Sequence, residues 1–298
     1  LISLMALGIK AGDEVITTPF TFVATAEVIV LLGAIPVFAD IEPETCNIDA
    51  TKIEATITEK TKAIMPVSLY GQPADMDEIN AIAAKHKLPV IEDAAQSFGA
   101  EYKGKKSCNL STIGCTSFFP SKPLGCYGDG GALFTNDEAI AQACREIRVH
   151  GQSKRYCHTR IGVGGRMDTI QCAVVLAKLE RFTWEVEQRK KIGAYYNQLM
   201  DESGIQRVQQ KVDRTTVFAQ YTVIIDNREA IQEHFKKKGI PSAVHYPIPL
   251  NEQTAYKLYS QEKRTPIAAE LAKKVMSLPM HPRLEKAVQL EAVKALCI

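Results

Sequence analysis

Short β-rich runs alternate with helix-like segments along the first half of the chain. The apolar and β-branched positions predict strands over residues 14–18, 36–39, 63–67, 89–92, 114–119 and 131–135. Apolar residues at helical spacing lie between these runs, for example over residues 24–32 and 75–86. Strands and helices that alternate at this spacing form βαβ units, so the sequence predicts an α/β fold with a mostly parallel sheet.

The pattern changes after residue 168. Residues 168–200 have the pattern of one long helix, apolar at its start and charged at its end. Beyond it the pattern predicts a strand over residues 217–225 and helices over residues 228–238, 267–275 and 284–296. We therefore expect a large α/β domain over residues 1–182 and a small C-terminal α+β domain over residues 183–298.

The first eight residues match the second half of an amphipathic helix that ends at Gly8. The chain opens on Leu1 rather than on methionine, inside this helical pattern. We therefore expect that the N-terminal part of the large domain is missing from this sequence.

Charge and composition exclude several classes of protein. The 36 basic and 34 acidic residues nearly balance, which argues against a general nucleic-acid or membrane-surface binder. No run approaches the roughly 20 apolar residues of a membrane span, and no signal peptide is visible, so we expect a cytoplasmic protein. The eight cysteines include no Cys-x-x-Cys pair, which argues against a zinc ribbon, and no metal site is expected.

Lys122 is the only charged residue between positions 107 and 128. Removing a lysine from water in apolar surroundings disfavours its charged form, so its pKa should fall. An amine with a lowered pKa is the nucleophile that Schiff-base chemistry needs. The simpler alternative is a loop lysine whose end reaches water.

Residues 89–96 place two carboxylates at the end of a buried strand. Adjacent strand residues point to opposite faces, so Glu92 and Asp93 must have different roles. Ligands of α/β proteins bind at the carboxyl ends of parallel strands, where Asp93 could keep a pyridine nitrogen protonated. The alternative is that Asp93 and Gln96 form a capping box for a following helix.

Three further segments carry candidate binding groups. Residues 125–131 contain four glycines, but a strand follows them; a tight turn explains them equally well, and a dinucleotide-binding loop is poorly supported. Residues 145–166 are strongly basic, which suits either a diphosphate or carboxylate ligand or a solvated surface. His245 and Tyr246 end a short strand, where they can face a cleft; alternatively, His245 is a half-buried histidine with satisfied hydrogen bonds.

Taken together and in this order, these segments resemble the sugar aminotransferases of the DegT/DnrJ/EryC1/StrS family. The matching stretches, spread over nearly the whole chain, are residues 12–16, 21–25, 91–96, 117–122, 128–131 and 245–246. The resemblance implies a fold-type-I PLP-dependent transferase that acts as a homodimer. It also implies amino transfer from glutamate, with release of 2-oxoglutarate, to UDP-2-acetamido-2-deoxy-3-oxo-glucuronate for a bacterial surface polysaccharide.

The resemblance implies a role for each site residue. Lys122 forms the Schiff base with pyridoxal 5'-phosphate (PLP) and shuttles the proton, and Asp93 pairs with the pyridine nitrogen. Gln96 lies near the ring oxygen, Ser117 holds the phosphate and Phe22 stacks on the ring. The residues expected to contact the sugar nucleotide are Arg166, His245 and Tyr246.

Two positions depart from the family pattern. The family's Gly-Thr-x-Ala-Leu segment, whose backbone cradles the cofactor phosphate, should lie just before Leu1. The family also usually has an asparagine, lent by the neighbouring subunit to the phosphate, where this chain has Gly164. Because backbone amides at a helix start supply much of a phosphate site, both departures should weaken retention of PLP.

Three alternatives remain open at this stage. A sugar dehydratase of the same family would carry histidine in place of Lys122. A regulatory homologue without activity is consistent with the absent phosphate segment. An NAD-binding oxidoreductase would need a glycine fingerprint after the first strand, and the sequence has none there.

Overall fold

The computed structural model describes residues 1–260 and 265–297. Six strands form one sheet in the order β2-β1-β3-β4-β7-β8, since parallel bridges from Ile64 to Val90 and from Val67 to Asp93 join its two halves. Neighbouring strands are parallel except β8, which runs antiparallel to β7. The strands are β1 (Glu14–Thr17), β2 (Ile35–Phe38), β3 (Thr61–Ile64), β4 (Ile91–Asp93), β7 (Ile113–Ser117) and β8 (Gly131–Phe134).

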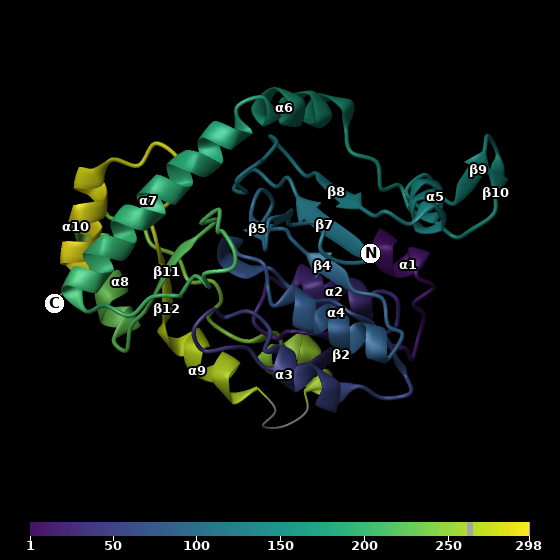
Figure 1. The fold of residues 1–298 in the computed structure, drawn as a ribbon, viewed down its shortest axis with the longest axis horizontal. Coiled ribbons are helices and arrows are strands. Elements are labelled where there is room, and N and C mark those ends of the chain that lie inside the picture. Colours follow the sequence, from purple (N-terminus) through teal and green to yellow (C-terminus); the bar gives the residue numbers. More distant parts are fainter. Residues whose placement is uncertain (261–264, 298) are drawn as a thin grey trace.

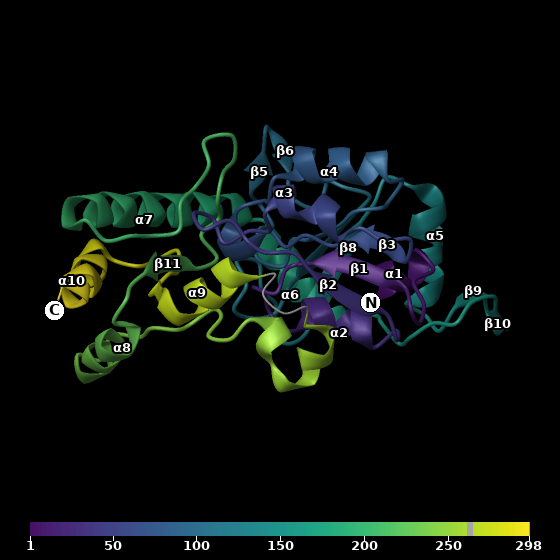
Figure 2. The same cartoon turned by 90° about the horizontal axis from the view of Figure 1, so that it is seen from below.

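Helices lie on both faces of this sheet, with α3 and α4 on one side and α2 on the other in Figure 2. Ile16 shares one buried cluster with Ile79 of α4, whereas the adjacent Val15 shares another with Ile29 of α2. Burial on both faces explains the continuous apolar runs of the strands. The helices of this part are α1 (Ile2–Ala6), α2 (Ala24–Val30), α3 (Ala50–Ile53), α4 (Met76–Lys85) and α5 (Glu138–Ile147), with 3-10 turns η1 (Glu54–Thr56) and η2 (Leu69–Gly71).

A break divides the single helix expected over residues 168–200. The structure has two helices, α6 (Thr169–Leu179) and α7 (Phe182–Ser203), which run in different directions in Figure 1. The expectation of one helix was therefore wrong. No glycine or proline marks the break; instead Phe182 packs on Phe98, with ring centroids 5.6 Å apart, and this buried contact fixes the start of α7.

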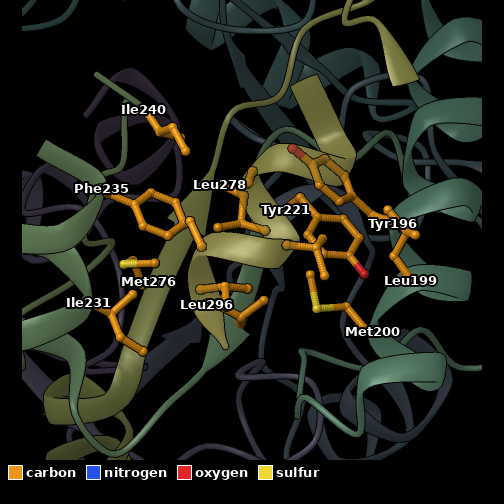
Figure 3. Close-up of a cluster of buried hydrophobic side chains, with 14 of the residues drawn as sticks. Tyr196, Leu199, Met200, Tyr221, Ile231, Phe235, Ile240, Met276, Leu278 and Leu296 are labelled. Carbon is orange, nitrogen blue, oxygen red and sulfur yellow. The ribbon is translucent and has the colours of Figure 1, made fainter. Parts of the chain in front are cut away.

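After α7, β11 (Tyr221–Ile224) and β12 (Val275–Leu278) form a two-stranded antiparallel ladder beside a second buried cluster. Figure 3 shows Tyr196 of α7, Phe235 of α8 and Leu296 of α10 in the buried cluster of this part. The remaining elements here are α8 (Arg228–Lys237), α9 (Pro266–Lys274), α10 (Lys286–Leu296), η3 (Leu250–Glu252) and η4 (Thr254–Tyr259).

The strand expected over residues 217–225 is shorter in the structure. Val217 donates a 3.0 Å backbone hydrogen bond to Gly71 and so joins the sheet-containing part instead of pairing with β12. Two small hairpins complete the fold: β5 (Glu101–Tyr102) with β6 (Lys105–Lys106), and β9 (Gln152–Lys154) with β10 (Cys157–His158). The second hairpin projects away from the rest of the chain in Figures 1 and 2.

Within the described ranges, none of the helices combines the length and the apolar character that crossing a membrane requires.

Candidate active site

Most of the predicted site residues follow the carboxyl ends of three parallel strands. Asp93 is the last residue of β4, and Ser117 is the last residue of β7. Phe22 lies between β1 and α2, and Lys122 lies in the loop after β7. This edge of an open α/β sheet is where ligands bind, because the loops that leave the strands can converge there.

Lys122 is half-buried in this loop. Burial lowers the pKa of its ammonium group, and the charge of Asp93 partly opposes that shift. The loop itself is ordered by backbone hydrogen bonds, from Lys122 to Phe119 at 2.9 Å and from Cys126 to the buried Phe118 at 2.7 Å. The pKa of Lys122 is therefore lowered in the direction that the sequence predicted, and the negative charge of Asp93 acts on its amine.

Asp93 has a side-chain partner on α2. Its Oδ2 accepts a 2.8 Å hydrogen bond from the Thr25 hydroxyl, and its Oδ1 accepts a 3.1 Å bond from the Ala95 amide. Residues 94–99 form turns and no helix, so the capping-box interpretation of Asp93 and Gln96 was wrong. The carboxylate is therefore held by a turn and by Thr25, and it is only partly buried.

Glu92 points to the other face, as the alternation along a strand requires. It is fully buried and accepts hydrogen bonds from the Ser68 hydroxyl (2.8 Å), the Ser107 hydroxyl (2.7 Å) and the Cys108 amide (2.7 Å). Burial nevertheless raises the pKa of this carboxyl group. Glu92 thus connects the loops that contain Ser68 and Ser107 through hydrogen bonds. Asp93 is the carboxylate on the opposite face of the strand, the face toward Thr25.

Gln96 connects two tyrosines. Its Oε1 accepts a 2.7 Å hydrogen bond from the backbone amide of Tyr70, and its Nε2 donates a 3.0 Å bond to the Tyr246 hydroxyl. The Tyr70 hydroxyl in turn donates to the backbone carbonyl of His245. The structure therefore brings His245 and Tyr246, which are distant in sequence, to the strand edge that carries Asp93.

Phe22 and Ser117 each leave a group available to a ligand. The Phe22 side chain is 56% exposed, and its ring centroid lies 6.4 Å from that of Tyr246. The Ser117 Oγ accepts a 3.1 Å hydrogen bond from the Phe119 amide, which leaves its own proton free to donate. An exposed aromatic face and a hydroxyl donor suit a planar ring and an anionic oxygen, respectively.

His245 is half-buried, and its Nδ1 lies 2.9 Å from the Ser277 hydroxyl. Burial and the positive charge of Lys122 both lower the pKa of its imidazole, so the neutral form is favoured. The alternative of a histidine with a satisfied hydrogen bond holds for Nδ1. The backbone of His245 is tied to the candidate site by the hydrogen bond from the Tyr70 hydroxyl to its carbonyl.

Arg166 does not join this cluster within the chain. Its side chain is exposed, and the described residues provide it with neither a hydrogen bond nor an ion pair. The basic stretch around it lies at α5 and the projecting β9–β10 hairpin. In that stretch Arg160 pairs with Glu146 at 2.8 Å, so part of the basic stretch has a structural partner rather than a free charge.

The sequence matches the family model of the DegT/DnrJ/EryC1/StrS aminotransferase family over residues 1–297. The chain belongs to this family. The resemblance to this family that the sequence segments indicated is therefore confirmed over essentially the whole sequence.

Similar proteins and solved structures agree with this assignment. The UDP-2-acetamido-2-deoxy-3-oxo-D-glucuronate aminotransferase of Pseudomonas aeruginosa is 57% identical over 293 residues, which make up 98% of this chain and 80% of that protein. The crystal structure of a family aminotransferase from Brucella abortus matches with a TM-score of 0.95 at 40% identity, over 99% of this chain and 82% of that one.

A further solved structure that matches is NtdA of Bacillus subtilis with bound cofactor PMP. It gives a TM-score of 0.89 at 28% identity, over all of this chain and 71% of that chain. These matches confirm the α/β fold with a parallel sheet expected for this family of transferases.

Three polar residues at the site were not predicted from the sequence. Thr25 bonds to Asp93, Tyr70 bonds to Gln96 and His245, and Ser277 bonds to the His245 ring. Thr25 lies in a segment shared with the family, and Tyr70 follows the carboxyl end of β3, so position along the chain could have suggested both. Ser277 lies inside a buried strand and carried no local signal.

Proposed function

We propose that this chain is a PLP-dependent aminotransferase that acts on a sugar nucleotide. The observation that carries the proposal is the half-buried Lys122, with its lowered pKa, in the loop after β7, at the sheet edge where β4 ends in Asp93. A poorly hydrated amine reacts with a carbonyl group as its free base, and a nearby carboxylate can pair with a pyridinium nitrogen. Membership of an aminotransferase family supports the same chemistry.

The residues present fit PLP. The exposed face of Phe22 suits stacking on a pyridine ring, Asp93 suits its nitrogen, and the Ser117 hydroxyl suits a phosphate oxygen. Gln96 lies beside these groups through its bond to Tyr246 and would approach the ring oxygen. When bound, PLP supplies the electron sink that makes the Cα–H bond of an amino acid acidic.

With PLP bound, two side chains of the site would have defined tasks. Lys122 would hold the cofactor through Nζ and would serve as the general base that moves the α-proton of the amino donor. Asp93, oriented by Thr25 and the Ala95 amide, would keep the pyridine nitrogen protonated. The lowered pKa of Lys122 increases the fraction of free amine available at neutral pH.

We further propose the substrates. Glutamate is the donor and 2-oxoglutarate the product, and the acceptor is UDP-2-acetamido-2-deoxy-3-oxo-glucuronate, aminated for a surface polysaccharide. The acceptor is supported by the 57% identity to the Pseudomonas aeruginosa enzyme named for that substrate. His245 and Tyr246, which Tyr70 and Gln96 hold at the sheet edge that carries Asp93, and Arg166 are the residues that would contact the sugar nucleotide.

A homodimer is part of this proposal. The helix α6 buries Val175 but exposes Ile170, Leu176 and Leu179, which is unusual for a helix on a globular protein. An exposed apolar surface of this kind suits the same surface of a second copy related by twofold symmetry. Such a partner could bring the basic β9–β10 region and Arg166 to the site.

We also propose that residues 1–182 and 183–298 are the two domains, the second a small α+β unit.

The visible absorption spectrum of the purified chain, mixed with PLP and then dialysed, tests this function. The wild-type chain should keep a band that disappears on addition of glutamate. The Lys122→Ala variant should have no such band, whereas Lys105→Ala, which alters an exposed lysine in β6, should behave as wild type. A wild-type chain without a Lys122-dependent band would overturn the proposal and favour a regulatory homologue.

A further inference from the structure

The ring of His245 contacts one hydroxyl of a buried pair in the β11–β12 ladder. Thr222 of β11 and Ser277 of β12 lie directly opposite each other, and their hydroxyl oxygens are 3.1 Å apart. Each residue is only 4% exposed. The Ser277 hydroxyl also lies 2.9 Å from Nδ1 of His245, so it bridges Thr222 and the imidazole.

The backbone ahead of His245 is fixed by the same residue. Ala243 and Ser277 exchange two backbone hydrogen bonds, of 2.7 and 3.2 Å, which form an isolated antiparallel bridge beside β12. His245 follows two residues later, at a bend of the chain, and its Nδ1 lies close to the hydroxyl of the same Ser277. The Tyr70 hydroxyl donates to the carbonyl of His245 and holds the end of this segment.

These contacts leave one imidazole nitrogen for a ligand. Nδ1 is engaged by Ser277, whereas Nε2 has no hydrogen-bond partner among residues 1–260 and 265–297. A serine hydroxyl can donate to Nδ1 or accept from it, so this bond fixes the position of the ring whichever nitrogen carries the proton. Burial and the charge of Lys122 keep the pKa of His245 low, which favours the neutral ring.

We propose that Ser277 is a positioning residue for substrate binding: its hydroxyl holds the His245 ring through Nδ1 and fixes its orientation, so that Nε2 is available to contact the sugar nucleotide. The inference rests on the proposed function, since it deepens the role of His245 on the acceptor side. It makes a residue within the β11–β12 ladder, which touches neither cofactor nor substrate, a determinant of acceptor recognition.

Steady-state kinetics of Ser277→Ala provide the first test. The KM for the UDP-linked keto sugar should rise roughly tenfold, the loss of one well-oriented hydrogen bond, with little change in kcat. The isolated half-reaction with glutamate should keep its rate. Ser277→Thr, which retains the hydroxyl, should restore most of the KM.

Thr222→Val is the matched control, because it removes a hydroxyl from the same buried pair without removing a contact to His245. We expect its KM to stay close to that of the wild type. If Thr222→Val and Ser277→Ala raise KM equally, the effect belongs to the packing of the ladder, and the inference is overturned. A wild-type chain that aminates no sugar nucleotide would instead overturn the proposed function.

Nitrogen-15 NMR of the histidine side chains provides a second test that needs neither cofactor nor activity. The His245 signals, identified by their loss in His245→Asn, should have the shift of a ring whose Nδ1 is hydrogen-bonded in the wild type. In Ser277→Ala the Nδ1 signal should lose the contribution of this hydrogen bond, and in Ser277→Thr it should return. Unchanged signals in Ser277→Ala would contradict the inference even if KM had risen.

Discussion

The Thr25 hydroxyl donates a 2.8 Å hydrogen bond to Oδ2 of Asp93, and it thereby links the first turn of α2 to the carboxylate at the end of β4. Thr25 is 3% exposed and its own oxygen lies 3.1 Å from the Thr21 hydroxyl. The carboxylate proposed to pair with the pyridine nitrogen is therefore oriented by a buried hydroxyl pair that follows β1.

Replacing Thr25 with valine should weaken catalysis without preventing Schiff-base formation. Valine keeps the shape but removes the donor to Asp93, and a hydrogen bond to a charged group contributes about 1.5–3 kcal/mol. We expect kcat/KM to fall by roughly 10- to 100-fold, measured with saturating PLP. Thr25→Ser should stay within a few-fold of wild type, and equal losses in both variants would argue against the hydrogen bond as the cause.

The stability of the apo chain should depend on pH through Lys122. Its pKa is lowered by burial from the ordinary lysine value of 10.5, so the unfolded chain binds more protons between the two values. Wild-type stability should therefore rise with pH across that window and be lowest below it. Lys122→Met, which buries no charge, should melt at a higher temperature than wild type at pH 7.

The difference in melting temperature between Lys122→Met and wild type should shrink as the pH approaches 10.5, because the amine of the folded wild-type chain is then neutral. Differential scanning calorimetry at several pH values measures this. A difference that stays constant with pH would show that the methionine acts through packing rather than through the charge.

Replacing Gly164 with asparagine should strengthen the binding of PLP. A Cβ at this exposed position would lie 3.2 Å from Cε1 of the His150 side chain, a contact that a small movement of the ring can relieve. If a second copy brings residue 164 to the cofactor phosphate, Gly164→Asn adds a donor to a charged group, and PLP should bind roughly tenfold more tightly. Dialysis against buffer, followed by absorbance, measures the retention.

Gly164→Ala is the control for the added Cβ, since it brings no amide group. Retention of PLP should be unchanged in that variant. Equal gains in the alanine and asparagine variants would mean that residue 164 acts through the backbone and makes no contact with the phosphate.

Asp40 joins the two parts of the chain by capping α9. Its carboxylate follows β2 and accepts hydrogen bonds from the backbone amides of Ile267 (2.9 Å) and Ala268 (3.0 Å), and the residue is 4% exposed. Asp40→Ala leaves buried donors without a partner, so it should lower the free energy of unfolding by about 1–3 kcal/mol. Urea denaturation measures the change.

Asp49→Ala provides the comparison for Asp40. Asp49 accepts from the Thr51 amide at 2.9 Å in an exposed setting at the start of α3, so its loss should cost about 0.5–1 kcal/mol. A loss for Asp40→Ala no larger than that for Asp49→Ala would show that the α9 cap adds little beyond an ordinary helix cap.

The features that follow from local physics were predictable from the sequence. The alternation of short apolar runs with helical segments predicted the parallel strands, and side-chain alternation predicted that Glu92 and Asp93 would differ. The isolation of Lys122 among apolar residues predicted the direction of its pKa. Each of these depends on neighbours within a few residues, which is the information a sequence pattern holds.

The missed features depend on contacts between distant residues. The break before α7 follows from the packing of Phe182 on Phe98, more than 80 positions earlier in the numbering, and no glycine or proline announces it. The Tyr70 hydroxyl reaches His245 across 175 positions. The capping box considered for Asp93 and Gln96 does not form, since no helix follows and Gln96 bonds to Tyr70 and Tyr246 instead.

The most direct test of the account follows the amino group itself. The chain would be incubated with PLP, ¹⁵N-labelled glutamate and UDP-2-acetamido-2-deoxy-3-oxo-glucuronate, and the products would be analysed by mass spectrometry. We expect the wild-type chain to form a UDP-linked amino sugar that carries the ¹⁵N label, and we expect Lys122→Ala to form none. Conversion of glutamate without label in the sugar would contradict the proposed acceptor, and no conversion of glutamate would contradict the aminotransferase itself.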